Sequence, residues 1–202
     1  PEETESAYRW AREIGADYLE CDMQVSKDGV VLALHDDNLK RTTNIETVFG
    51  ETLPREIRKN YYMKIGYSET EAEEKVKADE ANFVPNLPAY YTYEELLMLD
   101  AGSWFNNENL EEALPGLAKE KQYISTLEDL IMYSKGYRLI RDRNQPGMPR
   151  QYSIVGKTGE TITSLSGTAD IVKYDFGYEI DPVWEAGNKN IPGIYIEFKE
   201  PW

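Results

Sequence analysis

The feature that most constrains the fold is residues 18–35, which have the pattern of two strands joined by a tight turn. Residues 18–25 alternate between apolar and polar side chains, and this period of two predicts a strand with one buried face. Asp28-Gly29 is the strongest hairpin-turn signal in the chain. Residues 30–35 are almost continuously apolar, which predicts a second strand that is buried.

Two acidic residues share one face of the first of these strands. Side chains alternate along a strand, so Glu20 and Asp22 project together while their apolar neighbours point the other way. Two adjacent carboxylates repel each other unless a proton or a cation relieves the repulsion. Ca²⁺ and Mg²⁺, which prefer oxygen ligands, would relieve it. The alternative is a solvated strand face without a ligand, and the spacing alone favours that alternative.

His35 is the single histidine of the chain and stands at the end of the second strand. An imidazole exchanges protons near neutral pH, so this residue is a candidate general acid or base. The alternative is an ordinary surface or core histidine whose hydrogen bonds are satisfied. The residues around it do not decide between the two.

The composition limits the classes of protein to which the chain can belong. A hydrophobic fraction of 41% and four tryptophans indicate a globular domain, and 202 residues suffice for one domain or for part of a larger one. The net charge of −15 argues against binding to nucleic acid or to an anionic membrane surface, because both repel an acidic protein. Cys21 has no second cysteine with which to form an intrachain disulfide. No apolar run is long enough to span a membrane, so stable membrane insertion is not expected.

Helix and strand signals continue along the chain. Thr4 can cap a helix whose apolar positions are Ala7, Ala11 and Ile14, with Gly15 as its stop. Further elements are expected as helices at residues 68–81, 93–99 and 127–134, as a hairpin around Lys157-Thr158-Gly159 at 151–164, and as strands at 169–180 and 193–199.

Five short blocks give the chain a resemblance to a known family. They are Pro1-Glu2-Glu3-Thr4, residues 15–22, Lys27-Asp28-Gly29, residues 35–43 and residues 193–202. In this order the blocks resemble the glycerophosphodiester phosphodiesterase family, the glycerophosphoryl diester phosphodiesterases of the phospholipase C-like phosphodiesterase superfamily. Each block is short, but together they are specific.

The resemblance implies an α/β fold of the (β/α)₈ TIM-barrel type, with the chemistry at the carboxyl ends of the strands. Residues 1–202 are then expected to be the N-terminal part of one barrel domain, whose first strand and later strands lie outside this sequence. Two segments, at about 44–123 and 138–190, are expected as insertions, the first lying over the mouth of the site. Within the first, residues 51–64 show no clear period, and Trp104 is expected as a buried aromatic anchor.

The resemblance also assigns roles to individual residues. It makes Glu20, Asp22 and Glu197 the ligands of a Ca²⁺ or Mg²⁺ ion, and the all-oxygen set independently disfavours zinc. Lys199 would stabilise the charge on a phosphate oxygen or form a salt bridge to a neighbouring carboxylate, and both can hold. His35 would be a general acid or base. The family's second catalytic histidine and its phosphate-binding arginine precede the first matching block, so both are expected outside this sequence and the isolated chain is expected to be a poor catalyst.

The implied activity is metal-dependent hydrolysis of glycerophosphodiesters to sn-glycerol 3-phosphate and an alcohol by general acid–base catalysis. One alternative is a phospholipase D-like enzyme acting on sphingomyelin or lysophospholipids, which would need an exposed apolar rim for acyl chains. Another is a non-catalytic barrel that serves as a binding or surface protein. The expected partner is a small-molecule phosphodiester, and the expected location, by analogy, is periplasmic or secreted. The sequence gives no head-group alcohol, physiological cation or oligomeric state.

Overall fold

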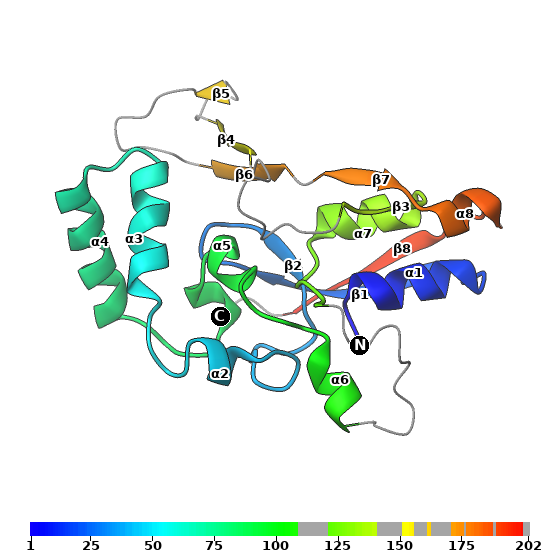
Figure 1. The fold of residues 1–202 in the computed structure, drawn as a ribbon, viewed down its shortest axis with the longest axis horizontal. Coiled ribbons are helices and arrows are strands. Elements are labelled where there is room, and N and C mark those ends of the chain that lie inside the picture. Colours follow the sequence, from blue (N-terminus) through cyan, green and yellow to red (C-terminus); the bar gives the residue numbers. More distant parts are fainter. Residues whose placement is uncertain are drawn as a thin grey trace.

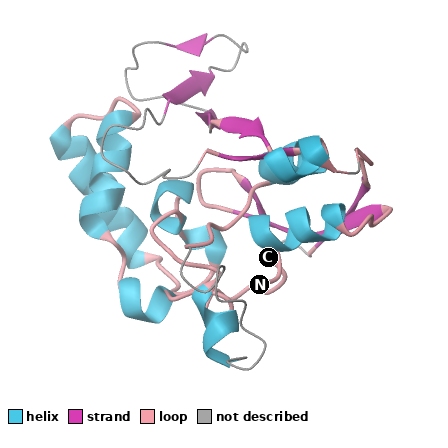
Figure 2. Cartoon of the chain, turned by 45° about the vertical axis from the view of Figure 1, so that its right-hand side comes forward, coloured by secondary structure: helices cyan, strands magenta, loops and turns pink. Residues whose placement is uncertain are grey.

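The computed structural model describes residues 1–108, 121–140, 151–155, 161–162, 171–175, 177–187 and 189–199. Within these ranges helices and strands are mixed along the chain, which confirms the expected α/β class (Figure 1). The described strands form three separate sheets of three, two and three strands, and they do not close into a barrel (Figure 1 and Figure 2). The partial barrel therefore stays an expectation.

The sheet that carries the predicted acids is built around β1 (Tyr18–Val25). β2 (Val31–Ala33) pairs with it antiparallel on one side, and β8 (Gly193–Phe198) pairs with it parallel on the other. In this register Asp22 lies opposite Glu197. The parallel pairing brings a segment near the end of the sequence to the acidic strand, as Figure 1 shows for the blue and red strands.

The turn between β1 and β2 forms as the sequence predicts. Gly29 has a φ of +83°, a left-handed conformation that glycine adopts without steric cost. The Ser26 hydroxyl donates to the Asp28 carboxylate over 2.6 Å and accepts from the backbone N–H of Val30 over 2.9 Å. β2 is shorter than the expected second strand, and it is largely buried as predicted.

The first helix, α1 (Glu5–Glu13), forms where the sequence predicts it, and Ala11 packs against the core, but the most buried side chains lie on the neighbouring face. Tyr8 and Arg12 are buried, whereas Ile14 is 67% exposed. Arg12 is buried in an ion pair: one of its guanidinium nitrogens lies 2.7 Å from the Asp181 carboxylate, and neither side chain is accessible to solvent. A buried charge needs a partner, and the partner of Arg12 lies far along the chain. The spacing of apolar residues alone could therefore not show that the face with Arg12 is buried.

Asp181 begins α8 (Pro182–Ala186), and its carboxylate accepts a hydrogen bond from the backbone N–H of Val183 in the first turn. The strand just before it, β7 (Tyr178–Ile180), pairs antiparallel with β3 (Tyr137–Leu139). The Arg12–Asp181 ion pair therefore ties this small sheet and α8 to α1.

The third sheet consists of β4 (Gln151–Val155), β5 (Thr161–Ile162) and β6 (Ile171–Asp175), with β4 in the middle. The antiparallel pairing of β4 with β5 confirms the hairpin predicted at residues 151–164, although its turn residues Lys157-Thr158-Gly159 lie outside the described part of the chain. The single strand expected at residues 169–180 is instead two strands, β6 and β7, which belong to different sheets.

Three helices begin with a reciprocal pair of hydrogen bonds between a capping hydroxyl residue and the acidic residue three positions later. They are α4 (Glu69–Ala81) with Ser68, α5 (Tyr93–Leu96) with Thr92 and α7 (Leu127–Ser134) with Thr126. Each such pair satisfies backbone N–H groups that have no partner within the helix. The sequence predicted all three of these starts, because capping depends only on neighbouring residues.

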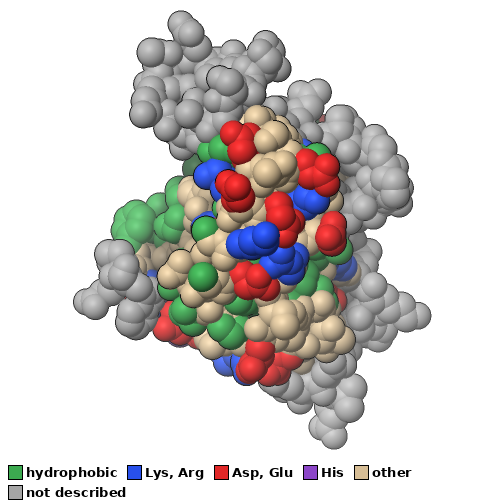
Figure 3. Space-filling view, turned by 90° about the vertical axis from the view of Figure 1, so that its left-hand side faces the viewer, with side chains coloured by type: hydrophobic (Ala, Val, Ile, Leu, Met, Phe, Trp, Pro, Cys, Tyr) green, Lys and Arg blue, Asp and Glu red, His purple; other side chains and the backbone are tan. Residues whose placement is uncertain are grey.

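The segment of residues 44–123 also contains helices that its pattern does not predict. They are α2 (Ile45–Val48), α3 (Arg55–Lys64), the 3₁₀ helix η1 (Pro88–Tyr90) and α6 (Ser103–Glu108). α3 packs beside α4 (Figure 1) and buries Arg58 and Tyr61, so it lacks an apolar period. On the face formed by these two helices, basic side chains lie among acidic ones (Figure 3), as in the ion pair of Lys59 with Glu69.

This segment contributes to the main core. Six of its fully buried side chains join the cluster that also contains Leu19 and Cys21 of β1; they are Ile45, Tyr91, Tyr93, Leu96, Leu97 and Leu99. Trp104 is only partly buried, but its indole N–H donates to the carbonyl of Ala101 over 3.0 Å, which anchors the ring. None of the described helices combines the length and apolar character needed to cross a membrane.

Candidate active site

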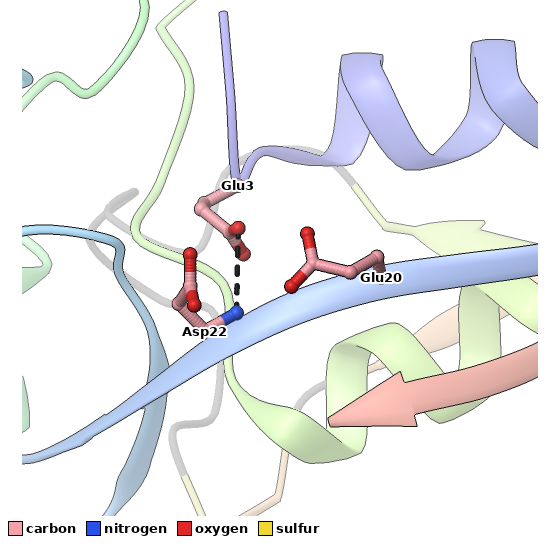
Figure 4. Close-up of side chains that lie close together, drawn as sticks. All are labelled: Glu3, Glu20 and Asp22. Atoms are coloured by element: carbon pink, nitrogen blue, oxygen red, sulfur yellow. Dashed lines mark hydrogen bonds between the residues drawn. The ribbon is translucent and has the colours of Figure 1, made fainter. Parts of the chain in front are cut away.

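Three carboxylates meet above the middle of β1. Glu20 and Asp22 project from the same face of the strand, as the alternation predicts, and the third is Glu3, which precedes α1 (Figure 4). One oxygen of each lies within 4.8 Å of the others. Three carboxylate oxygens this close can bind a hard cation.

Two hydrogen bonds fix the position of Glu3. Its carboxylate accepts from the hydroxyl of Tyr8 and, over 3.4 Å, from the backbone N–H of Asp22. Its backbone has a φ of +55°, a region that residues other than glycine seldom occupy. Sequence reasoning missed this residue, although Glu3 stands in the first block that carries the family resemblance.

The carboxylates perturb one another. Burial, together with the charges of Asp22 and Glu20, raises the pKa of Glu3 to about 7, against the opposing hydrogen bonds from the Tyr8 hydroxyl and the Asp22 N–H. Partial burial, Asp22 and Glu197 likewise raise the pKa of Glu20. Each shift means that the ionised group is destabilised where it stands. A bound cation would remove that destabilisation, so the donor set and its electrostatics fit a divalent ion.

Glu197 and Lys199 reach the site from β8 and the residue that follows it. The Lys199 ammonium lies 2.8 Å from a carboxylate oxygen of Asp22 and 2.8 Å from one of Glu197. The salt bridge that the sequence left open for Lys199 is therefore present. Glu197 is not one of the three carboxylates within 4.8 Å, and its side chain is 55% exposed. The hydrogen bond from Lys199 lowers the pKa of Glu197.

The imidazole of His35 lies beside these acids. Its Nε2 is 3.9 Å from the Asp22 carboxylate, and its Nδ1 is 2.7 Å from the carboxylate of Asp36. The hydrogen bond with Asp36 raises the pKa of His35. The side chain is 57% exposed, so a substrate can reach it. His35 is thus an accessible imidazole rather than a core histidine.

A comparison of the sequence with protein families identifies the family of this chain. The model described as "Glycerophosphoryl diester phosphodiesterase family" matches residues 1–145. The chain belongs to this family. The matched part contains Glu3, Glu20, Asp22 and His35, whereas Glu197 and Lys199 lie beyond it.

Individual members of the family show the same relationship at low identity. The glycerophosphodiester phosphodiesterase of Bacillus subtilis (strain 168) is 28% identical over 131 residues, which are 65% of this chain and 31% of that protein. The glycerophosphodiester phosphodiesterase of Caldanaerobacter subterraneus is 42% identical over 59 residues, which are 29% of this chain and 24% of that protein. The chain thus spans about a third or less of the length of these two relatives.

Among solved structures, the glycerophosphodiester phosphodiesterase from Agrobacterium tumefaciens matches with a TM-score of 0.39 and 23% identity, covering 67% of this chain and 38% of that one. A TM-score below 0.5 does not establish a common fold. The family assignment therefore stands on the sequence match over residues 1–145.

Proposed function

We propose that this chain carries part of the active site of a metal-dependent glycerophosphodiester phosphodiesterase, which hydrolyses a glycerophosphodiester to sn-glycerol 3-phosphate and an alcohol. The observation that carries the proposal is the group of Glu3, Glu20 and Asp22 with the His35 imidazole 3.9 Å from Asp22, in a chain of this family. Carboxylates that meet beside an accessible imidazole suit the hydrolysis of a phosphate ester, which needs both charge neutralisation and proton transfer.

Glu20, Asp22 and Glu197 would hold the cation, with Glu3 beside them. All of their donor atoms are carboxylate oxygens, which suits Ca²⁺ or Mg²⁺ and not zinc. When bound, the ion supplies positive charge that neutralises the phosphodiester. This local charge is needed, because a chain with a net charge of −15 repels an anionic substrate.

His35 and Lys199 supply the remaining chemistry of this chain. Hydrolysis requires that a proton be taken from the attacking water and that one be given to the leaving alkoxide, and the exposed Nε2 of His35 can perform one of these transfers. The ammonium of Lys199, held between Asp22 and Glu197, places a fixed positive charge next to the carboxylate group. It would stabilise the negative charge that develops on the phosphate oxygens.

The test is hydrolysis of glycerophosphocholine by the full-length protein, with and without a chelator. We expect the chelator to abolish the activity and added Mg²⁺ or Ca²⁺ to restore it. His35→Ala should lower kcat by about a hundredfold or more, because a proton-transfer group is lost. Asp37→Asn, an exposed neighbour that takes no part in the site, is the matched control and should not change the rate.

Three outcomes would contradict this assignment. Activity that survives both the chelator and His35→Ala would refute the mechanism. Hydrolysis of sphingomyelin or lysophospholipids in preference to glycerophosphocholine would favour the phospholipase D-like alternative. Cation binding without hydrolysis of any of these lipids would favour a binding protein.

A further inference from the structure

A network of charged side chains extends outward from His35. The Nδ1 of His35 lies 2.7 Å from one oxygen of Asp36. Arg41 donates to both oxygens of that carboxylate, through Nε over 2.5 Å and through Nη2 over 3.0 Å. Arg41 also donates to Glu2, over 3.2 Å through Nη1. Its guanidinium carbon lies 5.8 Å from the ring centre of Trp104.

These contacts hold the Asp36 carboxylate in one orientation. A guanidinium that donates to both oxygens fixes the plane of a carboxylate, whereas a single ammonium would let it turn. Arg41 is itself held by Glu2 before α1 and by Trp104 on α6, so three separate segments determine where Asp36 points. The Arg41 hydrogen bond lowers the pKa of Asp36 to about 2, which keeps the carboxylate ionised and therefore only an acceptor.

An acceptor at Nδ1 determines the chemistry of the other ring nitrogen. The hydrogen bond that one imidazole nitrogen makes decides which nitrogen carries the proton of the neutral ring. With Asp36 as the acceptor, that proton is on Nδ1, and the unprotonated Nε2 faces the acidic group, 3.9 Å from Asp22. Without this partner, a side chain that is 57% exposed would turn freely in solvent.

We propose that Asp36 and Arg41 are positioning residues that keep the proton of neutral His35 on Nδ1, so that Nε2 is the nitrogen that exchanges protons with the substrate. The kinetic part of this inference rests on the function proposed above, whereas the position of the proton does not. The competing explanation is a surface ion-pair network that only stabilises the fold. Such networks contribute little to the free energy of unfolding, so a stability measurement cannot separate the two explanations.

The NMR signals of the imidazole nitrogens report directly which of them carries the proton. His35 is the single histidine of these 202 residues, so a ¹⁵N-histidine sample of this chain gives one pair of ring resonances that need no residue assignment. Two-bond ¹H–¹⁵N spectra, recorded at a pH above the measured pKa of the ring, report which nitrogen carries the proton. We expect the wild-type ring to be protonated on Nδ1. Asp36→Ala and, independently, Arg41→Met should shift the ring toward a mixture with the proton on Nε2, and Asp37→Asn should leave it unchanged.

The activity of the full-length protein gives a second readout on the same substitutions. Asp36→Ala and Arg41→Met should lower kcat for glycerophosphocholine by about tenfold to a hundredfold with little change in KM, which is typical of the loss of a residue that orients a working group. Arg41→Lys keeps the charge but not the two-point contact, and it should give an intermediate kcat. Circular dichroism should show that all three variants are folded.

A wild-type ring protonated on Nε2, or a ring whose tautomer does not respond to Asp36→Ala, would overturn the inference. An unchanged kcat in Asp36→Ala and Arg41→Met would overturn the positioning role in catalysis. If the tautomer responds as expected but the full-length wild-type protein does not hydrolyse glycerophosphocholine, the structural inference is supported and the proposed function fails. The two failures are therefore distinguishable.

Discussion

The molecule holds two clusters of carboxylates that differ in how far their negative charge is compensated. Between α3, α4 and α5, the buried Arg58 donates to both oxygens of Glu95, over 2.8 and 2.7 Å, and also to Asp79. On β1, by contrast, Glu20 and Asp22 meet another carboxylate, that of Glu3. The Arg58 cluster thus contains its own positive counter-charge, whereas the β1 cluster consists mainly of negative charges.

The cations available to the second cluster are few. Among the described side chains, Asp22 forms ion pairs with Lys199 and, when the imidazole is protonated, with His35. Neutralised and hydrogen-bonded charges hold a fold together, whereas carboxylates that repel one another favour any cation that can enter between them. We infer that the Arg58 cluster stabilises the fold and that the β1 cluster binds a ligand.

The largest effect is expected on the free energy of unfolding, when the Arg58 cluster is disrupted. Arg58→Met should lower the free energy of unfolding by about 3–5 kcal/mol, because it leaves the buried Glu95 carboxylate without its counter-charge. Chemical denaturation, followed by circular dichroism, measures this loss. Binding of Mg²⁺ by the fraction that remains folded should not change.

Arg55→Met is the matched control on the same helix. Arg55 also pairs with two acidic residues, Glu73 and Glu80, but its side chain is 38% exposed. Exposed pairs contribute about 0–1 kcal/mol, so this variant should cost at most that much. Equal losses in Arg55→Met and Arg58→Met would remove the distinction between the two clusters.

A smaller effect is expected from pH on the β1 cluster. Glu3 has a pKa of about 7 in the folded protein and 4.5 ordinarily, so the unfolded chain loses this proton at a lower pH than the folded one. Between about pH 4.5 and 7 the folded state therefore binds more protons, and the contribution of Glu3 to stability falls as the pH rises. Thermal unfolding of the metal-free protein across this range should show the decline, and saturating Mg²⁺ or Ca²⁺ should reduce it.

Glu3→Gln tests the assignment of this effect, because glutamine does not titrate. The variant should lose the decline in stability between about pH 4.5 and 7 that is attributed to Glu3. Glu56→Gln, at an exposed position of α3, should retain it. A decline that persists in Glu3→Gln would mean that another group titrates, and the repulsion described here would not be centred on Glu3.

Local signals predicted part of this molecule. Glu20 and Asp22 share one face because side chains alternate along a strand. The turn at Asp28-Gly29 forms because glycine readily adopts the positive φ that the turn requires. The starts at Ser68 and Thr126 follow from hydrogen bonds within three residues. Each of these features depends on neighbours in the sequence, so the sequence carries the information directly.

Other features depend on partners far along the chain. α3 was missed because its buried face holds Arg58, whose charge is compensated by Glu95 and Asp79 in two other helices. Glu3 was missed because its place above β1 comes from a left-handed backbone and from contacts with Tyr8 and Asp22. No period or propensity encodes such contacts.

The far end of the chain was placed by resemblance alone. Only the family pattern indicated that residues 193–199 return to the site, and the parallel pairing of β8 with β1 bears out that arrangement. The roles of Glu197 and Lys199 there stay predictions. Much of β8 is exposed among the described residues.

The most direct test of the central claim is a calorimetric titration of metal-free protein with Mg²⁺ and with Ca²⁺. The account predicts that the wild-type chain binds one ion of at least one of these metals, and that Asp22→Asn weakens this binding by more than about tenfold while Glu56→Gln does not change it. Absence of binding in the wild-type protein, or equal binding by Asp22→Asn, would contradict the claim that the carboxylates on β1 form a cation site.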